Sequence, residues 1–132
     1  MNKLALSATA LGIFTGLGGA SHGPGEILQG NVAPETLVIE AWPTLTVLNG
    51  EPPMTIIPSY LLSGILTIAV GVLMAVWAGK FIEHKLSGMI LILLTVVLLL
   101  VGGGLAPPIF GFTAGILAIL NYRRLAKNGG ES

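Results

Sequence analysis

His22 and Glu26 are the first two side chains in the sequence that could act together, because they stand four residues apart. On a helix this spacing brings two side chains to one face, where an imidazole and a carboxylate could share a metal ion. However, Gly23, Pro24 and Gly25 separate them, and glycine and proline are the poorest helix formers. The sequence therefore predicts a solvated loop histidine at position 22 and no metal site.

Glu83 and His84 form a second pair, in a short charged segment between two apolar runs. Neighbouring residues on a helix point in different directions, so this pair is not a ready acid–base couple. The sequence contains no glycine-rich phosphate loop, HExxH helix or GxSxG turn. It also has no cysteine, which excludes a thiolate metal site and a cysteine nucleophile. We therefore predict that the protein is not an enzyme and has no catalytic, cofactor-binding or metal-binding residue.

Ionisable side chains are absent from three long apolar segments, residues 4–20, 57–79 and 86–122. Acids and bases inside a membrane are costly and usually functional, and ion-coupled transporters depend on them. Small four-helix multidrug exporters rely on a glutamate in their first helix, and segment 4–20 has none. The sequence therefore disfavours an ion-coupled exporter.

The composition is that of a membrane protein. Apolar residues make up 53% of the sequence and charged residues 9%, with a mean hydropathy of +0.89. A soluble domain has roughly a quarter of its residues charged. The net charge of +0 provides no field to attract nucleic acid. We predict a single membrane domain over residues 1–132, with the lipid bilayer as a partner and no nucleic-acid partner.

The apolar segments predict an all-α membrane protein with four transmembrane helices, at about 4–20, 57–79, 86–105 and 107–122, and an extracytoplasmic loop at 21–56. Residues 57–79 reach about 35 Å as a helix, enough to cross a hydrocarbon core of about 30 Å. Segment 86–122 is too long for one span. We expect a hairpin that turns at residues 102–108, since each proline there disfavours the α conformation of the preceding residue.

The first segment has two interpretations. It follows Met1-Asn2-Lys3 and ends in Gly18-Gly19-Ala20, which is also the layout of a cleaved secretory signal peptide. The same residues fit a retained helix. Cleavage would leave three transmembrane helices, and in both cases the following loop lies outside.

The basic residues predict the orientation. All 6 flank the apolar segments on one side of the expected topology: Lys3, Lys80, Lys85, Arg123, Arg124 and Lys127. Loop 21–56 contains no lysine or arginine. Basic flanks are retained in the cytoplasm. We therefore predict a multi-pass protein of the bacterial inner (plasma) membrane with cytoplasmic N- and C-termini.

The loop and the hairpin turn are expected to meet. The two hairpin arms are about 25 Å long, shorter than the hydrocarbon core, so the turn should lie below the outer surface. Irregular backbone at that depth must be covered by protein or a wet cavity. We predict that residues 36–48 cover residues 102–110 and that Trp42 is partly buried. The loop pattern permits either two short strands, at 36–39 and 45–48, or a short interfacial helix after Pro34.

Small residues recur at helical spacing. Gly12 with Gly16, and Gly111 with Gly115, predict close helix packing within the chain rather than buried polar bonds. Residues 57–120, which end in LLLVGGGLAPPIFGFTAGILA, resemble small uncharacterised multi-pass bacterial membrane proteins with a GGGxxPP helical-hairpin turn. The resemblance covers about half of the chain and implies the hairpin, but no activity.

Function is predicted only as a class. We expect a small structural or accessory protein that acts on another membrane component, as a homo-oligomer or with a membrane-protein partner. The alternative is a small oligomeric channel or uncoupled transporter, because four uncharged helices of one chain enclose no polar path.

Overall fold

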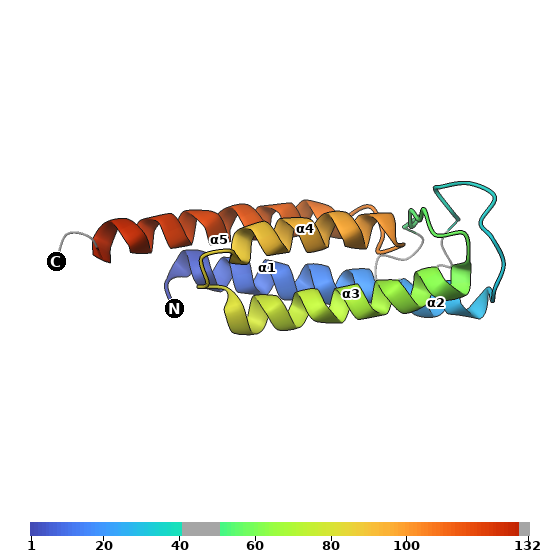
Figure 1. Cartoon of the computed structure of the whole chain (residues 1–132), viewed down its shortest axis with the longest axis horizontal. Helices are drawn as coiled ribbons and strands as arrows, with labels where there is room; N and C mark the ends of the chain where they lie inside the picture. The colour runs from blue at the N-terminus through green and yellow to red at the C-terminus, as the bar shows by residue number, and fades with distance from the viewer. Residues whose placement is uncertain (41–50, 130–132) are drawn as a thin grey trace.

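The computed structural model describes residues 1–40 and 51–129. This part of the chain is all-helical, with helices α1 (Lys3–Ala20), α2 (Gly23–Leu28), α3 (Tyr60–Phe81), α4 (Ser87–Leu100) and α5 (Pro107–Gly129). The four long helices lie side by side in an elongated bundle, and the short α2 extends from the end of α1 (Figure 1). Both termini lie toward one end of the bundle, and the connection from α2 to α3 lies at the other, which we call the loop end.

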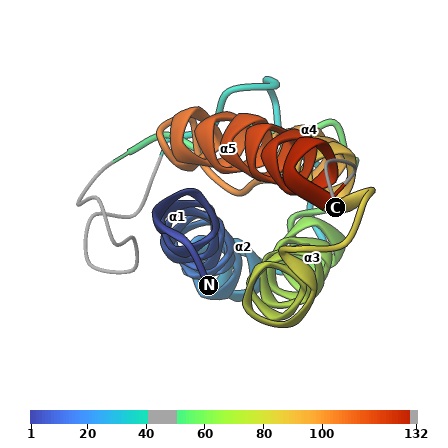
Figure 2. The ribbon, with the colours of Figure 1, turned by 90° about the vertical axis from the view of Figure 1, so that its left-hand side faces the viewer.

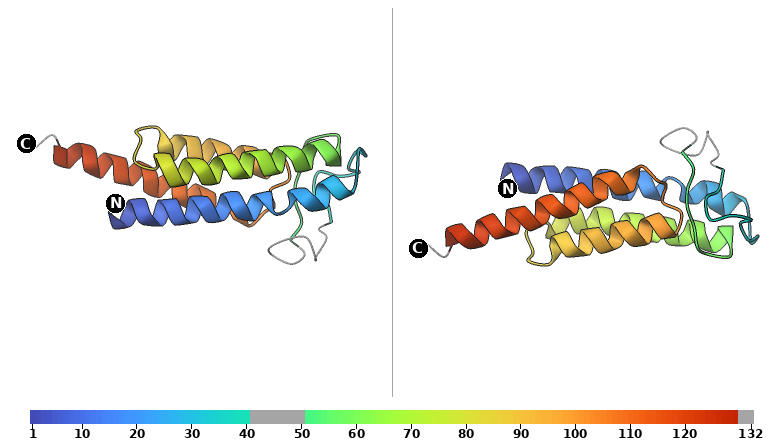
Figure 3. Two further views of the ribbon diagram at one scale, coloured as in Figure 1. Left: turned by 90° about the horizontal axis from the view of Figure 1, so that it is seen from below. Right: turned by 90° about the horizontal axis from the view of Figure 1, so that it is seen from above.

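The bundle has two layers (Figure 2). Helices α1 and α3 form one layer and the α4–α5 hairpin forms the other, so that α1 packs against α3 and α5, and α4 packs against α3 and α5. The views in Figure 3 show the hairpin lying along the other two helices, with the α3–α4 connection at the terminal end. The predicted helical hairpin is therefore present.

Local sequence determines where the helices begin and end. The side chain of Asn2 caps α1 by accepting a hydrogen bond from the backbone N of Ala5 at 3.0 Å. Helix α4 ends at Leu100 rather than near 105 as expected, because Gly102 and Gly104 have φ values of 119° and 84° that end the helical path. Pro107 begins α5, where its missing N–H has no cost. We call residues 101–106 the hairpin turn.

Two further helix boundaries and one additional helix differ from the predictions. Helix α3 begins at Tyr60 instead of residue 57, because the Ser59 hydroxyl caps it by accepting from Leu62 N at 3.3 Å. Helix α5 continues to Gly129, beyond the expected end at 122. Within loop 21–56, the structure contains a helix, α2, where the Gly-Pro-Gly run predicted none. Pro24 fits there because it lies in the first turn.

The rest of the described loop is extended rather than helical. Val38 pairs with Met54 in an isolated antiparallel bridge, and Thr55 pairs with Val101 in another. The interfacial helix considered after Pro34 is therefore not formed. The second strand considered, at 45–48, lies outside the described residues.

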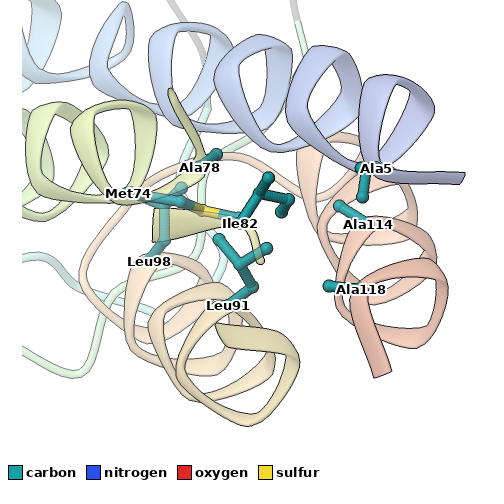
Figure 4. Close-up of a cluster of buried hydrophobic side chains, with 9 residues drawn as sticks. Ala5, Met74, Ala78, Ile82, Leu91, Leu98, Ala114 and Ala118 are labelled. Atoms are coloured by element: carbon teal, nitrogen blue, oxygen red, sulfur yellow. The ribbon is translucent and has the colours of Figure 1, made fainter. Parts of the chain in front are cut away.

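Small side chains fill the interior. Figure 4 shows Ala5 of α1 facing Ala114 and Ala118 of α5, while Met74 of α3 lies near Leu91 of α4. The other buried apolar side chains of this cluster are Ala8, Ala78, Ile82 and Leu98. Alanine thus supplies much of the apolar core, which permits close approach of the helix backbones.

Glycine pairs mark the closest approaches of the helices. A Cβ added at Gly16 would collide with the carbonyl of Gly71, and one added at Gly71 would collide with the carbonyl of Gly16. Gly88 and Gly115 meet in the same reciprocal way between α4 and α5. The two GxxxG pairs of the sequence therefore pack within the chain, as predicted.

Large apolar side chains cover the outside of the bundle. On the four long helices, those with more than half of their area exposed are Leu6, Leu17, Leu73, Met89, Leu93, Ile109 and Ile116. Two helical segments, Lys3–Leu28 and Tyr60–Phe81, are long and apolar enough to cross a membrane. Helix α4 is equally apolar but has only 14 residues, or about 21 Å.

Candidate functional site

His22 and Glu26 are buried at the loop end, each only 2% exposed. This corrects the prediction of a solvated loop histidine. The physical reason is that Gly23 lies against the backbone of Gly64 in α3, where a Cβ would meet the Gly64 carbonyl at 2.7 Å. The glycines that disfavour a helix in isolation allow α2 to touch α3, and that contact covers the polar side chains between them.

The Glu26 carboxyl lies directly against the hairpin turn. A Cβ added at Gly102 would lie 2.6 Å from the carboxyl carbon of Glu26, and the φ of 119° there also favours glycine. The hydroxyl of Ser63 lies beside the carboxyl. Neither carboxyl oxygen has a hydrogen-bond partner among the described residues. An unpartnered buried carboxyl is unusual, because its desolvation is not offset by hydrogen bonds.

Glu51 joins His22 to the hairpin turn. Its Oε2 lies 3.5 Å from His22 Nε2, and its Oε1 accepts a hydrogen bond from the backbone N of Ala106. Both side chains are at least nine-tenths buried, at 1% and 9% exposed. The lack of a side chain at Gly104 leaves space for the His22 imidazole, because a Cβ at Gly104 would lie 2.5 Å from His22 Nε2. Residues far apart in the sequence are thus brought to one place.

Hydroxyl groups satisfy the end of α4. The carbonyl of Val101 accepts from Thr67 Oγ1 at 2.7 Å and lies 2.5 Å from Ser63 Oγ, which is also 2.7 Å from Thr55 Oγ1. The last carbonyls of a helix have no partner within it, so these hydroxyls replace the missing N–H donors. The prediction of glycine packing instead of buried polar bonds is therefore wrong at this end, where the structure has both.

Residues 51–56, which we call the cover segment, lie over the hairpin turn. In addition to the Thr55–Val101 bridge, the backbone N of Ile56 donates to Leu100 O at 2.9 Å. The prediction assigned this contact to residues 36–48. In the structure, the backbone N of Ile39 donates to Pro53 O at 3.0 Å, so that part of the loop contacts the cover segment. Trp42 lies outside the described residues.

We call the buried polar side chains at this end the loop-end cluster: His22, Glu26, Glu51, Thr55, Ser63 and Thr67. This cluster is set back from the loop end of α3. Its α3 members, Ser63 and Thr67, lie one to two turns inside the helix that begins at Tyr60. Helix α3 is about 33 Å long and α4 about 21 Å, so the hairpin turn falls short of the loop end of α3. The first apolar helical segment extends to Leu28 and includes His22 and Glu26. The expectation of no ionisable group in the first helix therefore holds for residues 4–20 but not for the whole segment.

The terminal end of the bundle is simpler. Asn2 Nδ2 donates to Asn121 Oδ1 at 2.6 Å and ties α1 to α5. Glu83 and His84 are exposed, and His84 Nδ1 accepts from Leu86 N at 3.3 Å within the turn. The pair thus lies on the surface, as the sequence indicated.

The loop-end cluster gathers side chains that can bind and release protons. Two carboxyls, one imidazole and several hydroxyls are enclosed together, with unsatisfied atoms on His22 and Glu26. Among residues 1–40 and 51–129, no three His, Asp or Glu side chains are arranged to hold a metal ion. Sequence reasoning missed this cluster, although the i, i+4 spacing of His22 with Glu26 and of Ser63 with Thr67 was a signal for two polar faces.

The chain matches no protein-family model, no characterised protein and no solved structure. Its function must therefore be argued from the bundle and the cluster themselves.

Proposed function

We propose that the chain is a small multi-pass integral membrane protein whose four long helices cross the inner membrane, and that it serves as a structural or accessory partner of another membrane component. The observation that carries this proposal is the distribution of side chains. Leu93 is 61% and Ile109 66% exposed, while Ala5 and Thr67 are 0% exposed. Water favours the reverse arrangement, with large apolar side chains inside. Lipid favours this one, because small residues let helices pack closely.

The proposed topology has both termini in the cytoplasm. It is supported by the helix ends that carry the basic residues. Lys3 begins α1, Lys80 lies in the last turn of α3 and Arg124 lies in the last part of α5, and these three helix ends are at the terminal end of the bundle, opposite the acidic loop (Figure 1).

Cysteine labelling tests this topology, and the chain has no cysteine of its own. In intact cells, a membrane-impermeant maleimide is expected to label Leu37→Cys, which is 60% exposed in the loop, and not Asn128→Cys. Permeabilised cells provide the control, because both positions should then react. Labelling of Asn128→Cys from outside intact cells would contradict the orientation.

The hydrogen bonding of the buried hydroxyl groups in the bundle interior supports an accessory role. The hydroxyls of Thr15 and Thr95 are buried, but they donate to Leu11 O at 2.8 Å and Leu91 O at 2.7 Å of their own helices. They are therefore satisfied locally and do not line a polar path. The alternative function, an oligomeric channel or uncoupled transporter, would require a polar path formed between several copies.

Photo-crosslinking distinguishes the two functions. A photoreactive amino acid at Leu73, Leu93 or Ile116 probes three exposed helix faces, and one at the buried Ala78 is the matched control. An accessory protein is expected to give one defined heteromeric product from one face. Products between copies from two faces, together with ion flux through reconstituted vesicles, would favour the channel. Lipid adducts alone from all three faces would contradict both.

A further inference from the structure

We propose that Glu26 is a proton-binding site that controls closure of the loop end: the protonated carboxyl fits the closed structure, and loss of the proton releases the cover segment from the hairpin turn. This inference goes beyond the proposed accessory role and does not depend on it. It rests on the burial of Glu26, on the charges around it and on its contact with the turn.

The first argument is the environment of the carboxyl. Glu26 is 2% exposed and neither of its oxygens has a hydrogen-bond partner among the described residues. An ionised carboxylate in such a place loses its hydration and keeps only the neighbouring Ser63 hydroxyl as a polar contact, which does not offset that loss. A neutral carboxyl loses far less. A proton, unlike a metal ion, requires no cavity and no further ligands.

The second argument is that no cation balances Glu26. Of the groups near it, His22 is paired with Glu51 at 3.5 Å, and Tyr60, which is close enough to feel the charges of both Glu26 and Glu35, is not a cation. Helix α4 directs its C-terminal carbonyls toward this point, and that end of a helix dipole repels an anion. The six basic residues are Lys3, Lys80, Lys85, Arg123, Arg124 and Lys127, all outside this cluster.

The third argument links the carboxyl to the cover segment. Glu26 lies against Gly102, and the preceding residue, Val101, forms the bridge to Thr55. Ser63 lies beside Glu26 and within 2.7 Å of Thr55 Oγ1. Lifting the cover segment therefore opens the cluster to water, where an ionised carboxylate is stable.

Linkage gives the sign of the effect. The closed state binds the proton and the open state releases it, so closure is favoured at low pH and opening at high pH. Where one proton is released on opening, the opening equilibrium rises about tenfold per pH unit. His22 acts in the opposite direction, because burial lowers its pKa in the closed state although Glu51 lies beside it, so that protonation of His22 favours opening at low pH. The experiment must therefore distinguish the effect of Glu26 on the pH dependence of closure from the effect of His22.

The test measures access to the cover segment in lipid nanodiscs, which leave both faces open to solvent. Thr55→Cys places a thiol at a position that is 0% exposed, and Leu37→Cys places one at a position that is 60% exposed. The ratio of their maleimide rates at each pH cancels the ionisation of the thiol. We expect this ratio to rise by about tenfold per pH unit from the pH at which an exposed carboxyl loses its proton up to the pH at which the buried carboxyl also loses it, and to be flat above that. With Glu26→Gln, a neutral isostere, the ratio should stay low and should not rise with pH.

Three results would overturn the proposal: no rise with the native Glu26, an unchanged rise with Glu26→Gln, or a flat ratio only with His22→Gln. Replacing sodium by choline at constant pH should have no effect, and a sodium-dependent closure would assign the site to a metal ion instead. Should Thr55→Cys fail to fold, hydrogen exchange at the Ile56 amide, which donates to Leu100 O, gives the same comparison between the native chain and Glu26→Gln.

Discussion

Gly71→Ala is expected to destabilise the folded bundle by about 3 kcal/mol, because the added methyl group has no space. Its Cβ would collide with the carbonyl of Gly16 and would lie 2.8 Å from the Cβ and 2.9 Å from the backbone N of Ala20. Backbone atoms cannot move aside as a flexible side chain can. Relief therefore requires α1 and α3 to separate along their contact.

Gly79→Ala, on the same helix, is the matched control. A Cβ at Gly79 would meet only Ile13 Cδ1, at 3.8 Å, which is ordinary van der Waals contact. Alanine in a helix gains roughly 0.5–1 kcal/mol over glycine, so this variant is expected to be as stable as the native protein or more stable. Thermal unfolding in detergent measures both variants. Equal effects would mean that α1 and α3 do not touch at Gly71.

Gly102→Ala is expected to open the loop end and to cost more than Gly30→Ala. Both glycines have positive φ values, 119° and 81°, so each alanine pays a backbone cost of about 1–2 kcal/mol. A Cβ at Gly30 would meet nothing within 4 Å, whereas one at Gly102 would lie 2.6 Å from the Glu26 carboxyl carbon. The difference between the two variants contains the contact with Glu26 and the less favourable φ of 119° at Gly102, and a double-mutant cycle separates these two contributions.

A double-mutant cycle checks that assignment. Glu26→Ala removes the carboxyl that the new methyl group would meet, so the Gly102→Ala/Glu26→Ala pair should lose less stability than the sum of the single variants. The expected coupling is about 1–3 kcal/mol, measured by unfolding in detergent. Additive effects, or equal losses of stability for Gly102→Ala and Gly30→Ala, would mean that Glu26 does not lie against the hairpin turn.

The helices of the hairpin could be predicted because their signals are local. The apolar run from residue 86, the glycines at 102–104 and the prolines at 107–108 act through backbone conformation within a few residues. The end of α4 at Leu100 was harder to predict, because the carbonyls at this end are satisfied by distant residues. The hydroxyls of Ser63 and Thr67 in α3 donate to Val101 O, and the backbone N of Ile56 donates to Leu100 O. The GxxxG pairs predicted packing correctly, since small size is a property of the residue itself.

The buried cluster could not be predicted from local patterns. The sequence around His22 contains two glycines and a proline, and propensity alone indicates a loop. Contact with Gly64 overrides that propensity, and Gly102, Gly104 and Glu51 complete the enclosure from distant segments. Burial of a charged residue is a tertiary property, so only the assembled bundle reveals it.

The central claim is that the bundle lies in lipid, with small side chains inside and large apolar side chains outside. The most direct test measures whether its exposed leucines contact lipid or water. Nitroxide spin labels at Leu73 and Leu93, which are 52% and 61% exposed, are compared with one at Val32 in the loop, which is 60% exposed. Oxygen dissolves in lipid and a neutral nickel chelate in water. The structure predicts faster relaxation by oxygen than by nickel at Leu73 and Leu93, and the opposite at Val32. Faster relaxation by nickel at both leucines would place the bundle in water and contradict the account.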